Sequence, residues 1–125
     1  MGRVRGMPVL ILTTVGRKTG KKRVNPVVYM RDGTNYVVVA ANNGADEHPA
    51  WFLNLRRNPR ITMEVDDKEL PVIARQASAD EQARLWPRLV ERGPFFEGYK
   101  KKAKRDIPIV ILEPIHSSAE GQGVR

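Results

Sequence analysis

Six short runs rich in apolar residues constrain the fold of this chain more than any other feature. They occupy residues 8–14, 24–31, 36–42, 60–67, 69–76 and 107–114. Runs of this length, rich in β-branched residues and bounded by turn residues, are typical of strands. The Asp-Gly turn at 32–35 and the polar residues near 66–68 each join two runs, and both connections predict antiparallel hairpins. Pro71 lies in the last strand of the second hairpin and predicts an exposed edge or a bulge there.

Three segments between the strands have the spacing of helices: 48–59, 78–93 and 96–105. Ser78 and Glu81 have the separation of a capping box, which marks the start of the second helix. Pro87 is expected to kink that helix or to divide it in two. Helices that interrupt strand pairs, without regular βαβ alternation, predict an α+β fold. We expect one small, mostly antiparallel barrel of about six strands with about three short helices.

Length and composition limit what the chain can be. The 125 residues are enough for one hydrophobic core, so 1–115 are expected to form a single domain. The tail, residues 116–125, has Val124 as its only large apolar residue and is expected to be disordered. There is no cysteine, which excludes disulfides and thiolate chemistry. Neither a secretory signal nor an apolar run of the roughly 18 residues needed to span a bilayer is visible, so a cytoplasmic location is expected.

The positive charge of the chain is concentrated at its N-terminal end. The net charge is +8, and eight of the 22 Lys and Arg residues lie in the first 31 residues, where no acidic residue occurs. The 14 basic residues that follow are matched by 14 acidic ones. A nucleic-acid-binding module would spread its cations along a face, so this alternative is disfavoured. A compact anionic ligand fits better, and a peripheral contact of the basic N-terminus with an anionic membrane stays open.

Five of these cations lie in one segment, residues 17–23, between two strand-like runs. The overlapping stretch "GRKTGKK", residues 16–22, lacks the order of a P-loop, because no Ser or Thr follows Lys21. Backbone amides, the hydroxyl of Thr19 and the guanidinium groups of Arg17 and Arg23 all suit phosphate or carboxylate. A solvated turn that only aids solubility is the alternative. The flanking strands favour a ligand site, since they place the loop at the mouth of the barrel.

Most of the usual catalytic constellations are absent. The two histidines, His48 and His116, do not have the spacing of metal ligands, and no pair of carboxylates falls on one helix face. The sequence therefore predicts no metal site.

The segment from residue 12 to 61 resembles the deazaflavin-dependent nitroreductase family of actinobacteria. The resemblance rests on the ordered series TTxGRKTG, RVNP, RDG and PxWFLNL, and it extends from about Pro8 to Pro114. Members of this family are split β-barrel proteins, similar to flavin reductases and pyridoxamine oxidases, that use reduced coenzyme F420. The resemblance implies an oxidoreductase that transfers a hydride from the reduced coenzyme to a quinone-like or nitro-aromatic acceptor.

The resemblance also implies which residues hold the coenzyme, a small polyanion with a phosphodiester, a lactyl carboxylate and a polyglutamate tail. The phosphate and the tail would contact Arg17, Lys18 and Thr19. The ring and its linker would be lined by Arg23, Val24, Asn25, Pro26, Val27 and Val28, and by Val39, Ala40, Ala41 and Asn42. The pocket would be closed by Ala50, Trp51, Phe52, Leu53 and Asn54. Packing in the core is a second role, compatible with the first, for Trp51 and Phe52.

The substrate side departs from the family pattern. In "RGPFFEGYKKK" only Tyr99 is a tyrosine, and Gly93 and Phe96 stand where family members can have one. Tyr99 is therefore the candidate catalytic residue, as a hydrogen-bond partner or proton donor, with simple packing as the alternative. The remaining apolar wall favours a flat, quinone-like acceptor over nitroimidazole-type compounds. An FMN-binding split-barrel reductase and a non-enzymatic cofactor carrier remain alternatives, and the sequence leaves the oligomeric state open.

Overall fold

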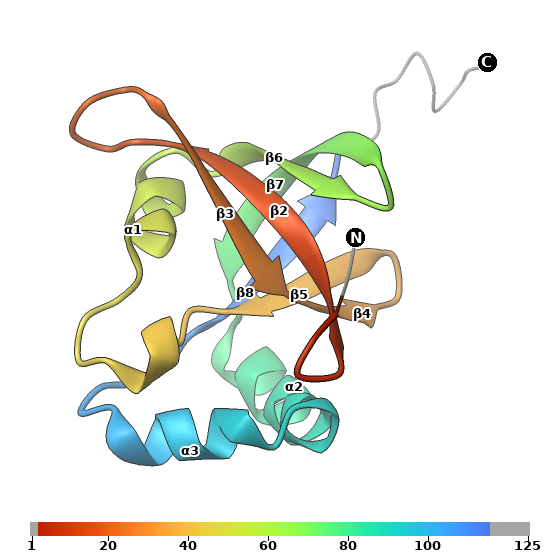
Figure 1. The fold of residues 1–125 in the computed structure, drawn as a ribbon, viewed down its shortest axis with the longest axis vertical. Coiled ribbons are helices and arrows are strands. Elements are labelled where there is room, and N and C mark those ends of the chain that lie inside the picture. Colours follow the sequence, from red (N-terminus) through yellow and green to blue (C-terminus); the bar gives the residue numbers. More distant parts are fainter. Residues whose placement is uncertain (1–2, 116–125) are drawn as a thin grey trace.

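The strands of the chain form one curled antiparallel sheet in a computed structural model that describes residues 3–115 (Figure 1). They are β1 (Arg3–Val4), β2 (Met7–Val15), β3 (Lys22–Val28), β4 (Met30–Asp32), β5 (Asn35–Val39), β6 (Arg60–Val65), β7 (Lys68–Gln76) and β8 (Ile109–Pro114). Their order in the sheet is β1-β2-β6-β7-β8-β5-β4, and β3 pairs with β2 outside this path. The predicted α+β class and mostly antiparallel split barrel are confirmed.

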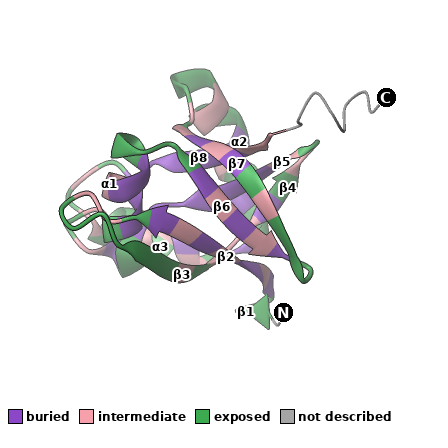
Figure 2. Ribbon diagram, turned by 90° about the horizontal axis from the view of Figure 1, so that it is seen from above, coloured by how far each residue is buried: buried purple, intermediate pink, exposed green. Residues whose placement is uncertain are grey.

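The run predicted as one strand over 24–31 is two strands with different neighbours. β3 pairs with β2, whereas β4 pairs with β5, and the chain changes partner at Tyr29. The amide of Tyr29 still donates to the carbonyl of Pro8, 3.0 Å away. Because β3 does not pair with β5, the barrel is open on this side, and β3 is exposed along most of its length (Figure 2).

Both predicted hairpin turns are present. Asp32 pairs with Asn35 in the first, and Val65 pairs with Lys68 in the second. β7 as a whole is not an edge strand, because it lies between β6 and β8, but its pairing with β8 begins only at Val72 and leaves Pro71 exposed just beyond it. Pro71 is tolerated there because it stands at the end of the β7–β8 pairing, where its carbonyl accepts from the amide of Ile115.

The three predicted helices are α1 (Ala50–Arg57), α2 (Ala79–Arg92) and α3 (Phe95–Lys102), and a short 3₁₀ turn, η1 (Asn42–Gly44), precedes α1. The capping box is present, since the Glu81 amide donates to Ser78 Oγ and the Ser78 amide donates to Glu81 Oε1. α2 is not divided at Pro87. That residue is exposed, so water can replace the missing helical bond. No helix within residues 3–115 is long and apolar enough to cross a membrane.

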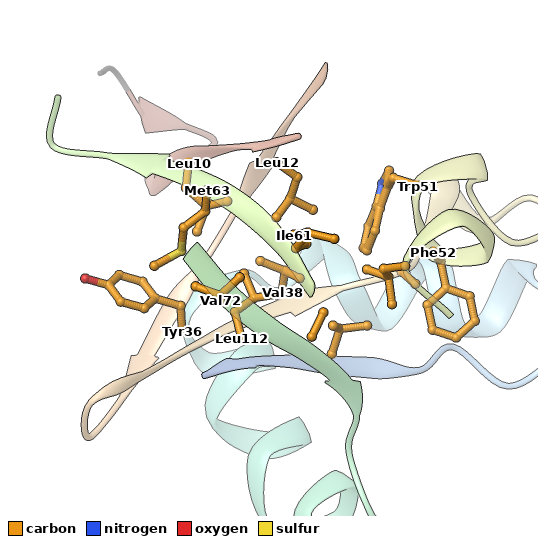
Figure 3. Close-up of a cluster of buried hydrophobic side chains, with 14 of the residues drawn as sticks. Leu10, Leu12, Tyr36, Val38, Trp51, Phe52, Ile61, Met63, Val72 and Leu112 are labelled. Carbon is orange, nitrogen blue, oxygen red and sulfur yellow. The ribbon is translucent and has the colours of Figure 1, made fainter. Parts of the chain in front are cut away.

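The sheet carries a hydrophobic cluster on each face. On β5, Tyr36 and Val38 point into the barrel, where they meet Trp51, Phe52 and strands β2, β6 and β7 (Figure 3). Their neighbours Val37 and Val39 pack on the other face, against α2 and α3. β8 alternates in the same way, and this two-sided burial explains why both strands read as nearly continuous apolar runs. The tail predicted to be disordered, 116–125, and His116 with it, lie outside the described residues.

Candidate functional site

A cleft of about 550 Å³ lies where the barrel is open, between β3 and the segment that runs from β5 through η1 to α1. The structure brings ten of the residues predicted from the sequence together in its lining: Asn25, Pro26, Val27, Val28, Val39, Ala41, Asn42, Ala50, Trp51 and Tyr99. Six further lining residues were not among the predicted site residues: Val4, Arg5, Asn43, Pro49, Phe95 and Phe96. The apolar "PFF" run gave a sequence signal for Phe95 and Phe96, which form the predicted apolar wall.

The other predicted residues lie outside the cleft lining. Ala40 and Phe52 are fully buried in the core. Val24 is exposed on β3 and Leu53 is partly buried on α1. Arg17, Lys18, Thr19 and Arg23 lie in or beside the β2–β3 loop, which projects past α1 (Figure 1).

Asn54 anchors this basic loop to α1. Its side chain is only 2% exposed, although it was predicted to contact the cofactor. Its Oδ1 accepts from both the amide and Nη1 of Arg17, each at 3.1 Å, and its Nδ2 donates to Thr14 Oγ1 at 3.2 Å. Since α1 also lines the cleft through Ala50 and Trp51, one helix joins the loop to the cleft.

The loop itself is closed by short-range hydrogen bonds. The Gly16 amide donates to the Lys21 carbonyl at 2.7 Å, and the Gly20 amide donates to the Gly16 carbonyl at 2.8 Å. Thr19 Oγ1 accepts from the Lys21 amide, so this hydroxyl shapes the turn. Lys18, Lys21, Lys22 and Arg23 are exposed, so the loop and the strand residues that follow it present four cations to solvent.

Arg105 holds the opposite wall of the cleft and was missed by sequence reasoning, because it lies far along the chain from the segment it contacts. Its guanidinium donates to the carbonyls of Ala40, Ala41 and Ala45 and contacts His48 Nδ1 at 3.0 Å. Burial, with the nearby Arg105 charge, lowers the pKa of His48, so the neutral ring accepts this bond. Burial also lowers the pKa of Arg105 itself.

Gly44 lets η1 approach α3 closely. Its φ is +81°, and a Cβ there would lie 3.2 Å from both Cα and the carbonyl oxygen of Tyr99. A side chain would therefore push the loop away from the helix. Asn42 stabilises the same loop by donating from Nδ2 to the carbonyl of Glu47 at 3.0 Å.

Aromatic residues of α3 form the remaining wall. The rings of Phe95 and Phe96 lie 4.5 Å apart, and Tyr99 meets both edge-on. The hydroxyl of Tyr99 accepts a hydrogen bond from Arg5 Nη1 at 2.6 Å. The cleft thus combines flat apolar walls with one phenolic hydroxyl, which suits a planar ligand that has a polar edge. Within residues 3–115, no group of three or more His, Asp or Glu residues could hold a metal ion.

Comparisons with known proteins agree on one family. The profile described as F420H(2)-dependent quinone reductase matches residues 1–114. Rv3178 of Mycobacterium tuberculosis, named as a candidate F420H(2)-dependent quinone reductase, is 41% identical over 108 residues, which cover 86% of this chain and 91% of that protein.

Two solved structures are also similar. One, described as the F420-H2 dependent reductase FDR-A, has a TM-score of 0.76 and 36% identity, and covers 85% of this chain and 94% of its own. The other, described as a domain-swapped dimer, has a TM-score of 0.77 and 36% identity, and covers 85% of this chain and 80% of its own.

Proposed function

Because this chain belongs to the F420H(2)-dependent quinone reductase family, with coenzyme F420 as its cofactor, we propose that the cleft holds the deazaflavin ring. In this proposal the basic 16–21 loop holds the phosphodiester and carboxylates of the same molecule. The family is one of oxidoreductases, and a quinone-type compound is the electron acceptor. One observation carries the proposal: Asn54 ties the basic loop to the helix that lines the cleft, so an anion site and a planar site are held together.

The residues present fit such a ligand. Small side chains at Ala41 and Ala50 leave room for a flat ring, while Val27, Val28 and Trp51 offer apolar contact. The exposed cations beside the cleft suit the anionic end, since charge-assisted hydrogen bonds are the stronger ones. FMN lacks the long polyanionic tail that this cation cluster would bind, and family membership does not favour the FMN-binding or the non-enzymatic alternative.

The chain contributes binding, orientation and a polar group to the reaction. When bound, the reduced coenzyme supplies a hydride. With the coenzyme bound, Trp51 and the aromatic wall of α3 would shield its ring from water, and Phe95 and Phe96 would give a planar acceptor an apolar surface. Tyr99 then serves as the group that orients the acceptor oxygen and donates a proton to it. A nitro-aromatic acceptor remains a further proposal for the same site.

Titration with F420 and FMN tests the assignment. We expect saturable F420 binding that is tighter than FMN binding. The double substitution Arg17→Ala and Lys18→Ala should weaken F420 binding. The loss should be at most about 1–3 kcal/mol per contact, because water around the exposed loop screens its charges. The loss should shrink at high salt.

A matched control carries Arg60→Ala and Lys68→Ala, at exposed positions of the β6–β7 hairpin. Tighter FMN binding would overturn the cofactor assignment. Unchanged F420 affinity in the loop variant at low salt would show that the loop is only solvated surface.

Other features stay proposals: a cytoplasmic location, contact of the basic N-terminus with anionic membrane, and a single domain over 1–115. Flotation with anionic vesicles tests the membrane contact, and light scattering on the purified protein determines the oligomeric state.

A further inference from the structure

The β1–β2 hairpin brings Arg5 to the rim of the cleft. Val4 pairs with Met7, which leaves Arg5 and Gly6 as a two-residue turn with φ of 51° and 82°. A turn with positive φ at both central residues favours Asn, Asp or Gly at the first of them. Arginine is an unfavourable residue for this backbone conformation, so the turn by itself does not account for Arg5.

The side chain of Arg5 reaches across to α3. Its Nη1 donates to the hydroxyl of Tyr99 at 2.6 Å, although the two residues are far apart in the sequence. The guanidinium carbon also lies 4.9 Å from the centre of the Phe95 ring and 5.7 Å from that of Tyr99, within the range of cation–π attraction. Arg5 and Tyr99 both line the cleft. Three contacts therefore hold this guanidinium against the wall proposed for the acceptor.

The direction of the hydrogen bond decides where the proton of Tyr99 can point. Every polar hydrogen of a guanidinium is a donor and none of its nitrogens accepts, so the Tyr99 hydroxyl cannot donate back to Arg5. The Tyr99 proton is therefore available to another acceptor. Because Tyr99 lines the cleft, a ligand bound there can supply that acceptor. A positive charge at this distance also stabilises negative charge on the phenolic oxygen as its proton leaves.

We propose that Arg5 is a positioning residue that holds the Tyr99 hydroxyl with its proton available to a quinone oxygen in the cleft. This inference rests on the proposed function. Reduction of a quinone to a hydroquinone takes a hydride, which F420H(2) supplies, and a proton. The Tyr99 O–H bond breaks as the bond to the quinone oxygen forms, and water returns a proton to the phenolate.

The substitution Arg5→Asn separates a structural role from a positioning role, because Asn suits the turn better than Arg. We expect its melting temperature to be equal to or above that of the unmodified protein, while kcat with menadione falls at least severalfold. The affinity for F420 should change little, and the solvent deuterium isotope effect on kcat should rise. Arg5→Lys, which keeps one charged donor, should restore part of the turnover. Arg60→Asn, at an exposed position away from the cleft, is the matched control.

A double-mutant cycle tests whether Arg5 acts through the hydroxyl. Tyr99→Phe keeps the ring and deletes the hydroxyl, so Arg5→Asn should lower kcat in the unmodified protein and hardly at all in Tyr99→Phe. Equal losses in both backgrounds, no loss from Arg5→Asn, or full turnover in Tyr99→Phe would each overturn the inference. If Arg5→Asn does not fold, Arg5→Lys takes its place in the cycle, and the loss of kcat that it causes should likewise disappear in the Tyr99→Phe background. An unmodified protein that fails to bind F420 would instead overturn the proposed function.

Discussion

At the scale of single residues, Asn54 connects two parts of the site through one buried amide. Both ends of the amide are used: the oxygen accepts from Arg17 and the nitrogen donates to Thr14. A buried group with this many partners is costly to remove, because the groups that it served lose their hydrogen bonds. The same amide also fixes the start of the cation-bearing loop relative to α1.

We expect Asn54→Ala to destabilise the protein by about 1–3 kcal/mol and to weaken F420 binding, because the Arg17 amide loses its acceptor and the loop loses its anchor. Urea denaturation and cofactor titration measure the two effects. Asn58→Ala, at an exposed asparagine just after the same helix, is the control and should change neither quantity much. If the Asn54 variant is destabilised but binds F420 as tightly as the unmodified protein, the hydrogen bonds of Asn54 support the fold and are not needed for cofactor binding.

The sequence indicated some of these residues better than others. Asn25 to Val28 line the cleft, as the motif implied, because they are consecutive residues of one strand. The inward orientation of Asn54 could not be predicted, since the helical pattern does not say what a polar residue on a buried face will meet. Arg105 was missed for a related reason: its partners, Ala40, Ala41 and Ala45, are distant in the sequence.

At the scale of elements, the start of α2 is tied to the sheet by Glu81. Its carboxylate accepts from Arg75 Nη1 at 2.7 Å and from the Ser78 amide at 2.9 Å, and Arg75 also contacts Glu113 of β8. The hydrogen bonds from Arg75 and then Ser78 lower the pKa of Glu81 to about 2, from an ordinary value of 4.5. The hydrogen bond to Glu81, together with that to Glu113, raises the pKa of Arg75.

Glu81→Gln should therefore change stability in a pH-dependent way. A carboxyl whose pKa is lower in the folded state stabilises the fold fully above its unfolded pKa, near 4.5, and loses this effect as the pH falls toward 2. The difference in melting temperature between the two proteins should be constant at neutral pH and shrink below about pH 4.5. Glu91→Gln, on the exposed side of α2, is the control. A difference that is independent of pH would contradict the role given to the charge.

Local signals predicted the elements well and their partners poorly. The Ser78 capping box and the Asp32–Asn35 turn depend on neighbours within four residues, so the sequence shows them directly. The change of partner at Tyr29 depends on β2 and β5, which compete for the chain from opposite sides. No local pattern records this change of partner. The resemblance implied a split barrel, but it did not indicate that the chain divides at Tyr29.

At the scale of the whole molecule, β8 holds the sheet together. It lies between β7 and β5 in the strand order, so it joins the β1-β2-β6-β7 half to the β5-β4 half (Figure 1). Its side chains also enter both hydrophobic clusters. The apolar run over 107–114 predicted a buried strand, and the resemblance implied a split barrel, but neither indicated this central place.

A chain that ends at Pro108 should therefore fail to fold cooperatively, whereas one that ends at Ile115 should fold. Circular dichroism during heating measures this, and a sharp transition in the shorter chain would contradict it.

The same strand order has a consequence for synthesis. Chains leave the ribosome from the N-terminus, and β8 is the last strand of the described residues to emerge. Until it does, β5 and β7 each lack a neighbour, and their apolar edges stand open to other chains. Both halves of the sheet therefore stay exposed until β8 has been synthesised. Aggregation, or binding by a chaperone, is most expected during this interval.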